Sequence, residues 1–162
     1  MSRVPSGYAP SRRITADDLL ASFDCGAPSL NSFLEHRALR NEAAGHSRTF
    51  VVVALEAAKR GHVAGYCALA MGAIGRARMP GSLRRNAPEL LPVAIVGRLA
   101  VDRRHTGQGI GEDLLIDAMR RIIHASREIG ACAILVQALG ANAAEFYRNY
   151  GFKPTEDEPL TL

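Results

Sequence analysis

The 162-residue sequence contains no tryptophan, and only nine residues are phenylalanine or tyrosine. It therefore offers no obvious platform of aromatic rings for stacking the bases of a nucleic acid. Its uncharged apolar runs stay well below the roughly 18 residues needed to cross a bilayer. The first residues lack the apolar stretch of a secretory signal peptide, so we expect a cytoplasmic protein with no membrane contact.

Cysteine is also scarce. Cys25, Cys67 and Cys132 lie far apart, are odd in number and form no Cys-x-x-Cys pair. A disulfide framework is therefore not expected, and neither is a metal cofactor. We expect each thiol to behave as a small buried hydrophobic group in a reducing compartment. No base accompanies any of them in a recognisable nucleophile pattern.

Lysine is nearly absent, because 18 of the 20 basic residues are arginine. The planar guanidinium suits phosphate groups, but the base composition of a genome can produce the same bias. The formal net charge of +4 permits a polyanionic partner without requiring one.

Length and composition indicate one globular domain, since 48% of the residues are hydrophobic and 22% are charged. Residues 1–13 carry three arginines, two prolines and no acid, which predicts a loose basic N-terminal arm. We expect a single domain over residues 14–162.

Hydrophobic periodicity predicts strands and helices in a mixed α/β arrangement. The expected helices are a short one starting at Thr15, one capped by Ser29 and ended by Gly45, a long amphipathic one from Ile110 that Gly130 stops, and one capped by Asn142 with Glu145. The expected strands are a hairpin of Thr49–Leu55 and His62–Ala70, a strand over Pro92–Val101 interrupted or bulged at Gly97, a sheet-interior strand over Ala131–Leu139, and a short one at Pro159–Leu162.

The most informative segment is Val101–Gly111, with the sequence VDRRHTGQGIG. Its three alternating glycines lie between an apolar strand and the start of the long helix, where backbone can approach a ligand closely. Free N–H groups and the helix dipole attract phosphate oxygens at such a place. The pattern fits neither a Walker loop nor a dinucleotide-binding fingerprint. It predicts a pyrophosphate cradle, with a plain connecting turn as the alternative, and His105 is expected to be a loop residue rather than a base.

Arg104-x-x-Gly107-x-Gly109 is similar to the Arg/Gln-x-x-Gly-x-Gly/Ala signature of the GCN5-related N-acetyltransferases (GNAT). The resemblance extends over about residues 14–162 and implies the GNAT fold: a mixed central sheet flanked by helices, with acetyl-CoA held between a central strand and the long helix. The coenzyme-binding residues it implies are Leu99, Ala100, Val101, Arg104, Thr106, Gly107, Gln108, Gly109, Ile110, Gly111 and Asn142.

Five further segments resemble a narrower group, the acetyltransferase toxins of type II toxin–antitoxin modules. They are Phe23–Gly26, Ser47–Val52, Gly65–Ala70, Gly97–Asp102 and Phe146–Phe152. Members of that group acetylate the α-amine of aminoacyl-tRNA and block translation. The resemblance thus implies aminoacyl-tRNA as substrate, a ribbon-helix-helix antitoxin as partner, contact with DNA only through that antitoxin, and a homodimer.

The same resemblance identifies Tyr147 as the catalytic residue that protonates the departing thiolate. A free phenol has a pKa near 10 and is protonated at neutral pH, so it can act as an acid. From spacing alone, Tyr147 also fits a core position beside Phe146 and Tyr150. The α-amine of an amino acid has a pKa near 7.7–8.0, so direct transfer needs no dedicated base.

The acceptor surface is expected among arginines on the second helix, the first strand of the hairpin and the basic loop between Gly75 and Leu91. These candidates for tRNA phosphates are Arg37, Arg40, Arg48, Arg76, Arg78, Arg84 and Arg85. A solvated surface, or one paired with acids of the antitoxin, is the alternative. Acetylation of a small amine or protein amine is the alternative activity, and a non-catalytic coenzyme- or partner-binding protein is the alternative of another class.

Overall fold

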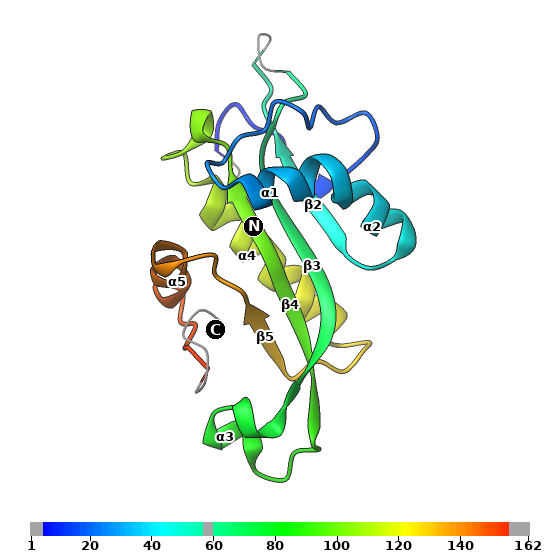
Figure 1. Cartoon of the computed structure of the whole chain (residues 1–162), viewed down its shortest axis with the longest axis vertical. Coiled ribbons are helices and arrows are strands. Elements are labelled where there is room, and N and C mark those ends of the chain that lie inside the picture. The colour runs from blue at the N-terminus through cyan, green and yellow to red at the C-terminus, as the bar shows by residue number, and fades with distance from the viewer. Residues whose placement is uncertain (1–4, 57–59, 156–162) are drawn as a thin grey trace. The chain divides into compact units, whose positions relative to one another are not determined.

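The computed structural model describes residues 5–56 and 60–155. Within them the elements are β1 (Arg12–Arg13), α1 (Pro28–Ser32), the π-helical turn η1 (Phe33–Arg37), α2 (Ala38–Ala44), β2 (Arg48–Val53), β3 (Val63–Gly75), the 3-10 turn η3 (Arg76–Arg78), α3 (Gly81–Arg84), β4 (Leu90–Val101), the 3-10 turn η4 (Arg103–His105), α4 (Ile110–Ala125), β5 (Ala133–Val136) and α5 (Ala141–Arg148) (Figure 1).

The described strands form a five-stranded sheet in the order β1-β2-β3-β4-β5. β2 pairs antiparallel with β1 and β3, whereas β4 and β5 run parallel. A mixed sheet flanked by helices confirms the predicted α/β class. The chain divides into two compact units, one of the described residues up to Leu69 with Arg98–Arg121, the other of Ala70–Gly97 with the described residues from Ile122 onward.

In the first unit, neighbouring residues of β3 face opposite layers of helix, as strand geometry requires. A Cβ at Gly65 would lie 2.8 Å from Ile110 and 3.0 Å from Leu114, so α4 packs directly on this face. Tyr66 is fully buried on the other face, where its ring contacts Phe33 and its hydroxyl donates to the Leu30 carbonyl at 2.7 Å. Figure 1 shows the strands of this unit between α1 and α4.

The N-terminal segment is not loose where the structure describes it, which corrects that expectation. Arg12 and Arg13 pair with β2 as strand β1. Their guanidinium groups bind Asp18 at 2.6 Å and the carboxylate of Glu42. The unpaired positive charges that suggested a mobile arm are therefore neutralised by acids farther along the chain. The division into an arm over 1–13 and one domain from residue 14 stays a prediction.

In the second unit, Ile74, Met79, Leu91 and Val93 form a small core. β5 pairs with β4 over Val93–Val96 and is the last strand in the described sheet. The expected interior strand over 131–139 is therefore shorter and partly exposed. An apolar run indicates that both faces of a strand are covered, but it does not show whether the strand has neighbours along both edges.

Three of the expected helix starts differ from the structure. Residues 15–18 form a turn, although the Thr15 N–H does donate to Asp18 at 2.7 Å as a capping box would. The helix expected from Ser29 begins at Pro28, whose fixed φ suits a first helical position, and has no side-chain cap. α5 begins at Ala141, which places Asn142 inside its first turn rather than at the cap.

Two further differences concern β4 and the end of α4. β4 continues without interruption through Gly97. α4 ends at Ala125 and a turn follows, so the helix is finished before Gly130. Gly45 does end α2, in the left-handed conformation with φ of 76°. The strand expected at 159–162 lies outside the described residues.

Candidate active site

The end of β4 carries the three residues predicted to offer backbone to the coenzyme. Ala100 is buried, while Leu99 and Val101 are half-buried. The ladder between β4 and β5 covers Val93 to Val96 and does not reach them within the described residues. Backbone groups on that edge of Leu99–Val101 are thus not used by β5, which is the condition for a ligand to bind them.

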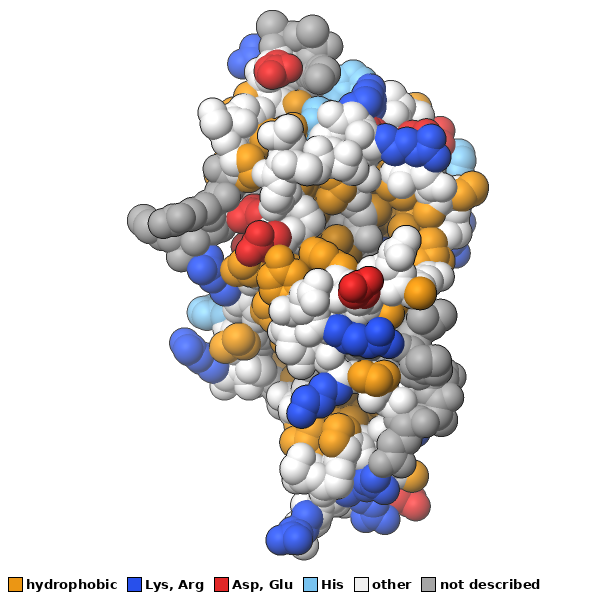
Figure 2. All heavy atoms as spheres, turned by 90° about the vertical axis from the view of Figure 1, so that its left-hand side faces the viewer, with side chains coloured by type: hydrophobic (Ala, Val, Ile, Leu, Met, Phe, Trp, Pro, Cys, Tyr) orange, Lys and Arg blue, Asp and Glu red, His pale blue; other side chains and the backbone are white. Residues whose placement is uncertain are grey.

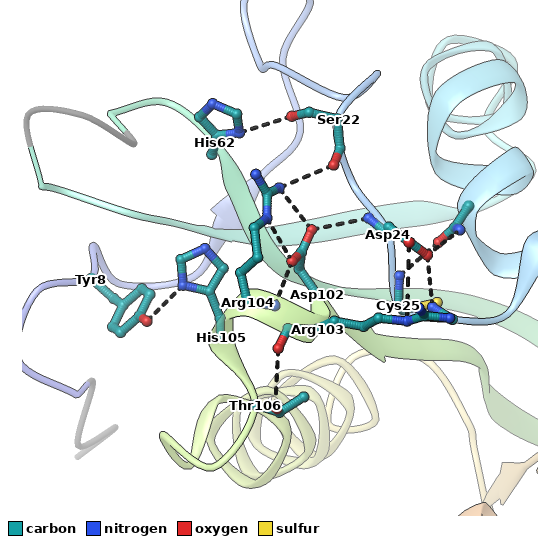
Figure 3. Close-up of polar contacts among 12 residues, drawn as sticks. Tyr8, Ser22, Asp24, Cys25, His62, Asp102, Arg103, Arg104, His105 and Thr106 are labelled. Carbon is teal, nitrogen blue, oxygen red and sulfur yellow. Dashed lines mark hydrogen bonds and ion pairs between the residues drawn. The ribbon is translucent and has the colours of Figure 1, made fainter.

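Asp102 follows directly and is fully buried. Its carboxylate accepts hydrogen bonds from the Arg104 guanidinium at 3.0 and 2.9 Å, from the Arg104 N–H at 2.8 Å and from the Asp24 N–H at 2.9 Å. Burial raises the pKa of this carboxyl, but these hydrogen bonds, from Arg104 above all, outweigh burial and lower the pKa to about 2. Asp102 is therefore an anion that fixes the turn η4 (Figure 3).

The Arg104 guanidinium consequently donates hydrogen bonds to two separate parts of the protein. Besides its bonds to Asp102, its Nη2 donates to the Ser22 carbonyl at 3.0 Å. The segment around Asp24 is held in the same network, since the Arg103 N–H donates to the Asp24 carbonyl at 2.9 Å. The predicted contact of Arg104 with the coenzyme stays a prediction, while the structure assigns its guanidinium to the scaffold of the loop.

The glycine loop itself is exposed over Thr106–Gly109. Gly107 and Gly109 have φ of 77° and 80°, a region that other residues rarely adopt. No atom lies within 4 Å of the place where a Cβ on either residue would stand. The first helical bond runs from the Asp113 N–H to the Gly109 carbonyl at 3.0 Å, so the N–H groups of Ile110, Gly111 and Glu112 have no partner inside the helix. The open space beside the glycines and the N–H groups at the start of α4 fit a pyrophosphate as the ligand.

His105 is buried rather than being a surface loop residue. Its Nδ1 lies 2.7 Å from the Tyr8 hydroxyl, and the two rings meet edge to face. Burial and the contact with Tyr8 fit a structural role, and the expectation that His105 is not the base stays a prediction. Among the described residues, the N-terminal segment therefore touches the turn that precedes the glycine loop.

Tyr147 belongs to the second unit and lies in α5. Its side chain is 3% exposed and its ring packs edge to face against Phe146 and Phe152, with centroids 5.4 and 5.9 Å away. The aromatic surroundings hold the ring in one position. Asn142 is exposed in the first turn of the same helix. The catalytic role of Tyr147 and the coenzyme contact of Asn142 stay predictions.

The seven candidate arginines divide between the two units. Arg37, Arg40 and Arg48 belong to the first and Arg76, Arg78, Arg84 and Arg85 to the second. Figure 2 shows Lys and Arg side chains gathered at the lower end of the view, the end where Figure 1 places α3. Their binding to tRNA stays a prediction.

Two residues with distinctive contacts near the predicted site were missing from the sequence interpretation. Asp102 stands between an apolar strand and a pair of arginines, and that position was the available signal for a carboxylate that anchors the loop. Arg98, one residue before the predicted acetyl-binding backbone, has its guanidinium 4.0 Å from the centre of the Phe33 ring. Nothing in its local sequence separates it from a solvated arginine.

Two kinds of feature are absent from residues 5–56 and 60–155. No cluster of three or more His, Cys, Asp or Glu residues could hold a metal ion. No helix is both long and apolar enough to span a membrane.

Comparison with known proteins gives the family. Residues 46–154 match the acetyltransferase (GNAT) domain. The chain is 44% identical over 157 residues to the tRNA-acetylating toxin of Mycobacterium tuberculosis (strain ATCC 25618 / H37Rv), covering 97% of this chain and 92% of that protein.

Two solved structures extend the likeness to three dimensions. AtaT complexed with acetyl-methionyl-tRNAfMet superposes with a TM-score of 0.85 at 31% identity, over 96% of this chain and 92% of that one. A variant of the AtaT toxin bound to the C-terminus of the antitoxin AtaR and acetyl-CoA gives 0.80 at 29% identity, over 97% and 92%. The chain belongs to the GNAT acetyltransferases.

Proposed function

We propose that this protein is the toxin of a type II toxin–antitoxin system, which transfers acetyl from acetyl-CoA to the α-amine of aminoacyl-tRNA and so blocks translation. The observation that carries the proposal is the 44% identity, over 97% of the chain, to a tRNA-acetylating toxin. The likeness to AtaT complexed with acetyl-methionyl-tRNAfMet supports the same acceptor class.

Acetyl-CoA supplies the acetyl group as a reactive thioester. Residues 104–111 hold its pyrophosphate, through the N–H groups at the start of α4 and the open space beside Gly107 and Gly109. Asn142 lies near the pantetheine end. The backbone of Leu99, Ala100 and Val101 orients the acetyl end, because β5 does not use that edge of β4.

Tyr147 holds a proton at its phenol oxygen and gives it to the departing thiolate. Its burial among aromatic rings fixes the direction of that oxygen. The ester lowers the pKa of the attacking α-amine below the roughly 7.7–8.0 of a free amino acid, so a substantial fraction of the amine is neutral near physiological pH. The reaction therefore proceeds by direct attack without a side-chain base. None of the three cysteines is part of this mechanism.

Partners follow from the toxin assignment. The protein binds aminoacyl-tRNA through its arginines and is neutralised by a ribbon-helix-helix antitoxin, through which alone it contacts DNA. A variant of AtaT has been captured with the C-terminus of its antitoxin, which supports a protein partner of this kind. We further propose that the toxin is a cytoplasmic homodimer with no membrane contact.

A pair of tyrosine variants tests the chemical assignment. Tyr147→Phe removes only the phenol oxygen, so it should keep the affinity for acetyl-CoA and lower the transfer rate at least 100-fold. Tyr150→Phe, in the turn that follows α5, is the matched control and should retain both. Equal transfer by Tyr147→Phe and wild type would remove Tyr147 from the mechanism.

A further inference from the structure

Two arginines from separate elements share one aromatic ring in the first unit. The Arg98 guanidinium of β4 lies 4.0 Å from the centroid of Phe33, and that of Arg37 lies 5.6 Å from it. Phe33 begins the π-helical turn η1 and Arg37 ends it. The ring is 1% exposed, whereas Arg98 is half-buried and Arg37 exposed, and the charge of Arg37 acts on Arg98 through space.

Neither guanidinium has a carboxylate partner among residues 5–56 and 60–155. Burial lowers the pKa of Arg98, and the positive charge of Arg37 adds to that effect. One arginine would suffice to cover the ring by a cation–π contact. A second like charge near it is repelled, and a bound anion would relieve that repulsion.

Arg121 provides the contrast within the same chain. Its guanidinium lies 4.0 Å from the centroid of Phe50, as Arg98 does from Phe33. It also binds the carboxylate of Asp117 at 2.7 Å. Arg121 thus stacks on a ring and also binds a carboxylate. Arg98 stacks on a ring in the same way but binds no carboxylate among the described residues.

The position of the pair suggests which anion it takes. Arg98 immediately precedes Leu99–Val101 on β4, and Ala100 lies only about 7 Å farther along the strand. An anion on Arg98 and Arg37 would therefore lie within one nucleotide's length of the backbone assigned to the acetyl end. In aminoacyl-tRNA the phosphate nearest to the α-amine is the 5′ phosphate of the terminal nucleotide, separated from it by one ribose and the ester.

We propose that Arg98 and Arg37, held on the Phe33 ring, bind a phosphate of the 3′-terminal nucleotides of tRNA and thereby position the acceptor amine. This inference rests on the proposed function for the identity of the RNA. It makes Arg98 a positioning residue, separate from the arginines of the basic segment 76–85, which belong to the second unit.

The test measures binding of a 5′-labelled single-stranded RNA ending in CCA, over a series of salt concentrations. Arg98→Met keeps an apolar chain on the ring and removes the charge. It should weaken binding about tenfold and reduce the slope of log K against log salt by about 0.7, the value for one lost contact on a single strand. Arg37→Gln should do the same, and Arg98→Lys should recover part of the affinity. Arg121→Met is the matched control and should bind like wild type.

Transfer to aminoacyl-tRNA separates this proposal from the proposed function. Arg98→Met should raise KM for aminoacyl-tRNA about tenfold, with unchanged affinity for acetyl-CoA. If wild type does not acetylate aminoacyl-tRNA, the proposed function fails, while the salt slopes still decide whether the pair binds RNA phosphate. If wild type does transfer but Arg98→Met and Arg121→Met bind RNA and react alike, the phosphate site is overturned.

Discussion

The Arg104 guanidinium makes two hydrogen bonds to Asp102, and the Arg104 N–H makes a third. The family signature allows glutamine in place of arginine at this position, and an amide can donate hydrogen bonds but carries no charge. Both residue types can therefore hold the loop by donating to a side chain inside the protein. At the scale of single residues, we interpret Arg104 mainly as an anchor of the glycine loop.

A double-mutant cycle measures this anchor. Asp102→Asn and Arg104→Gln should each lower acetyl-CoA affinity, about three- to tenfold. Asn at 102 turns a donor toward the guanidinium, and Gln at 104 leaves a buried carboxylate without its cation and with fewer donors. The double variant restores amide-to-amide bonding and should recover part of the loss, a coupling that isothermal titration calorimetry would detect.

The Arg12–Asp18 ion pair serves as the control, because its arginine is 43% exposed, like Arg104, and its acid is almost as buried as Asp102. Arg12→Gln and Asp18→Asn should leave coenzyme affinity unchanged. Equal losses in both cycles would assign the effect on affinity to general stability and not to the loop.

The low pKa of Asp102 predicts a pH dependence of stability. Its folded-state value is about 2 and lies below the ordinary value near 3.9, so the carboxylate stabilises the fold above about pH 4 and loses that contribution as the pH falls toward 2. Integrated over that shift, the contribution is about 2 kcal/mol. Urea unfolding at pH 6 and pH 3 should show the stability gap between wild type and Asp102→Asn shrinking at the lower pH. A constant gap would contradict the buried anion.

At the scale of elements, the close approach of β3 to α4 determines the position of the glycine loop. Gly65 leaves space that Ile110 and Leu114 fill, and Ile110 is the first residue of α4. Because the glycine loop ends at that residue, the contact fixes the N-terminus of the helix against the sheet. The packing of one strand thus positions the predicted anion site.

Gly65→Ala should therefore lower the free energy of unfolding by about 1–3 kcal/mol, since its Cβ would clash with both side chains and lie 3.2 Å from the Ala100 carbonyl. Gly75→Ala, on the same strand where no atom lies within 4 Å, should be neutral or mildly stabilising. Thermal unfolding monitored by circular dichroism compares the two. A neutral Gly65→Ala would show that α4 does not pack so closely.

The glycine loop and the end of α2 provide a second matched pair. Gly109 and Gly45 have φ of 80° and 76°, with open space at both. Alanine at either position should destabilise the protein by a similar amount, about 1 kcal/mol. Only Gly109→Ala should also weaken acetyl-CoA binding, by at least tenfold, because its methyl group enters the cradle. Loss of coenzyme affinity in Gly45→Ala as well would contradict a local effect.

At the scale of the whole molecule, the elements with strong periodicity were predictable from the sequence. The row Ile110, Leu114, Ala118 and Ile122 is buried along α4, and the antiparallel pairing of β2 with β3 follows the β-branched run. Gly107 and Gly109, predicted to let backbone approach a ligand, adopt the left-handed conformation that residues without a Cβ allow. Local pattern was sufficient for these features because each depends on nearby residues.

The features that were missed depend on residues distant in sequence. The N-terminal segment looked loose because the acids that bind Arg12 and Arg13 come later in the chain, one of them in α2. The pairing of Arg98 with the Phe33 ring joins β4 to η1. The burial of His105 depends on Tyr8, 97 positions away. Spacing within a short window contains no information about such contacts.

Radiolabelled acetyl transfer in a translation-competent extract tests the central claim most directly, with wild type and Tyr147→Phe compared side by side. The account predicts label on aminoacyl-tRNA that mild deacylation releases, and its loss in the variant; the labelled amino acid then identifies the acceptor. Label confined to proteins or small amines would contradict the toxin assignment and leave the GNAT family unchanged.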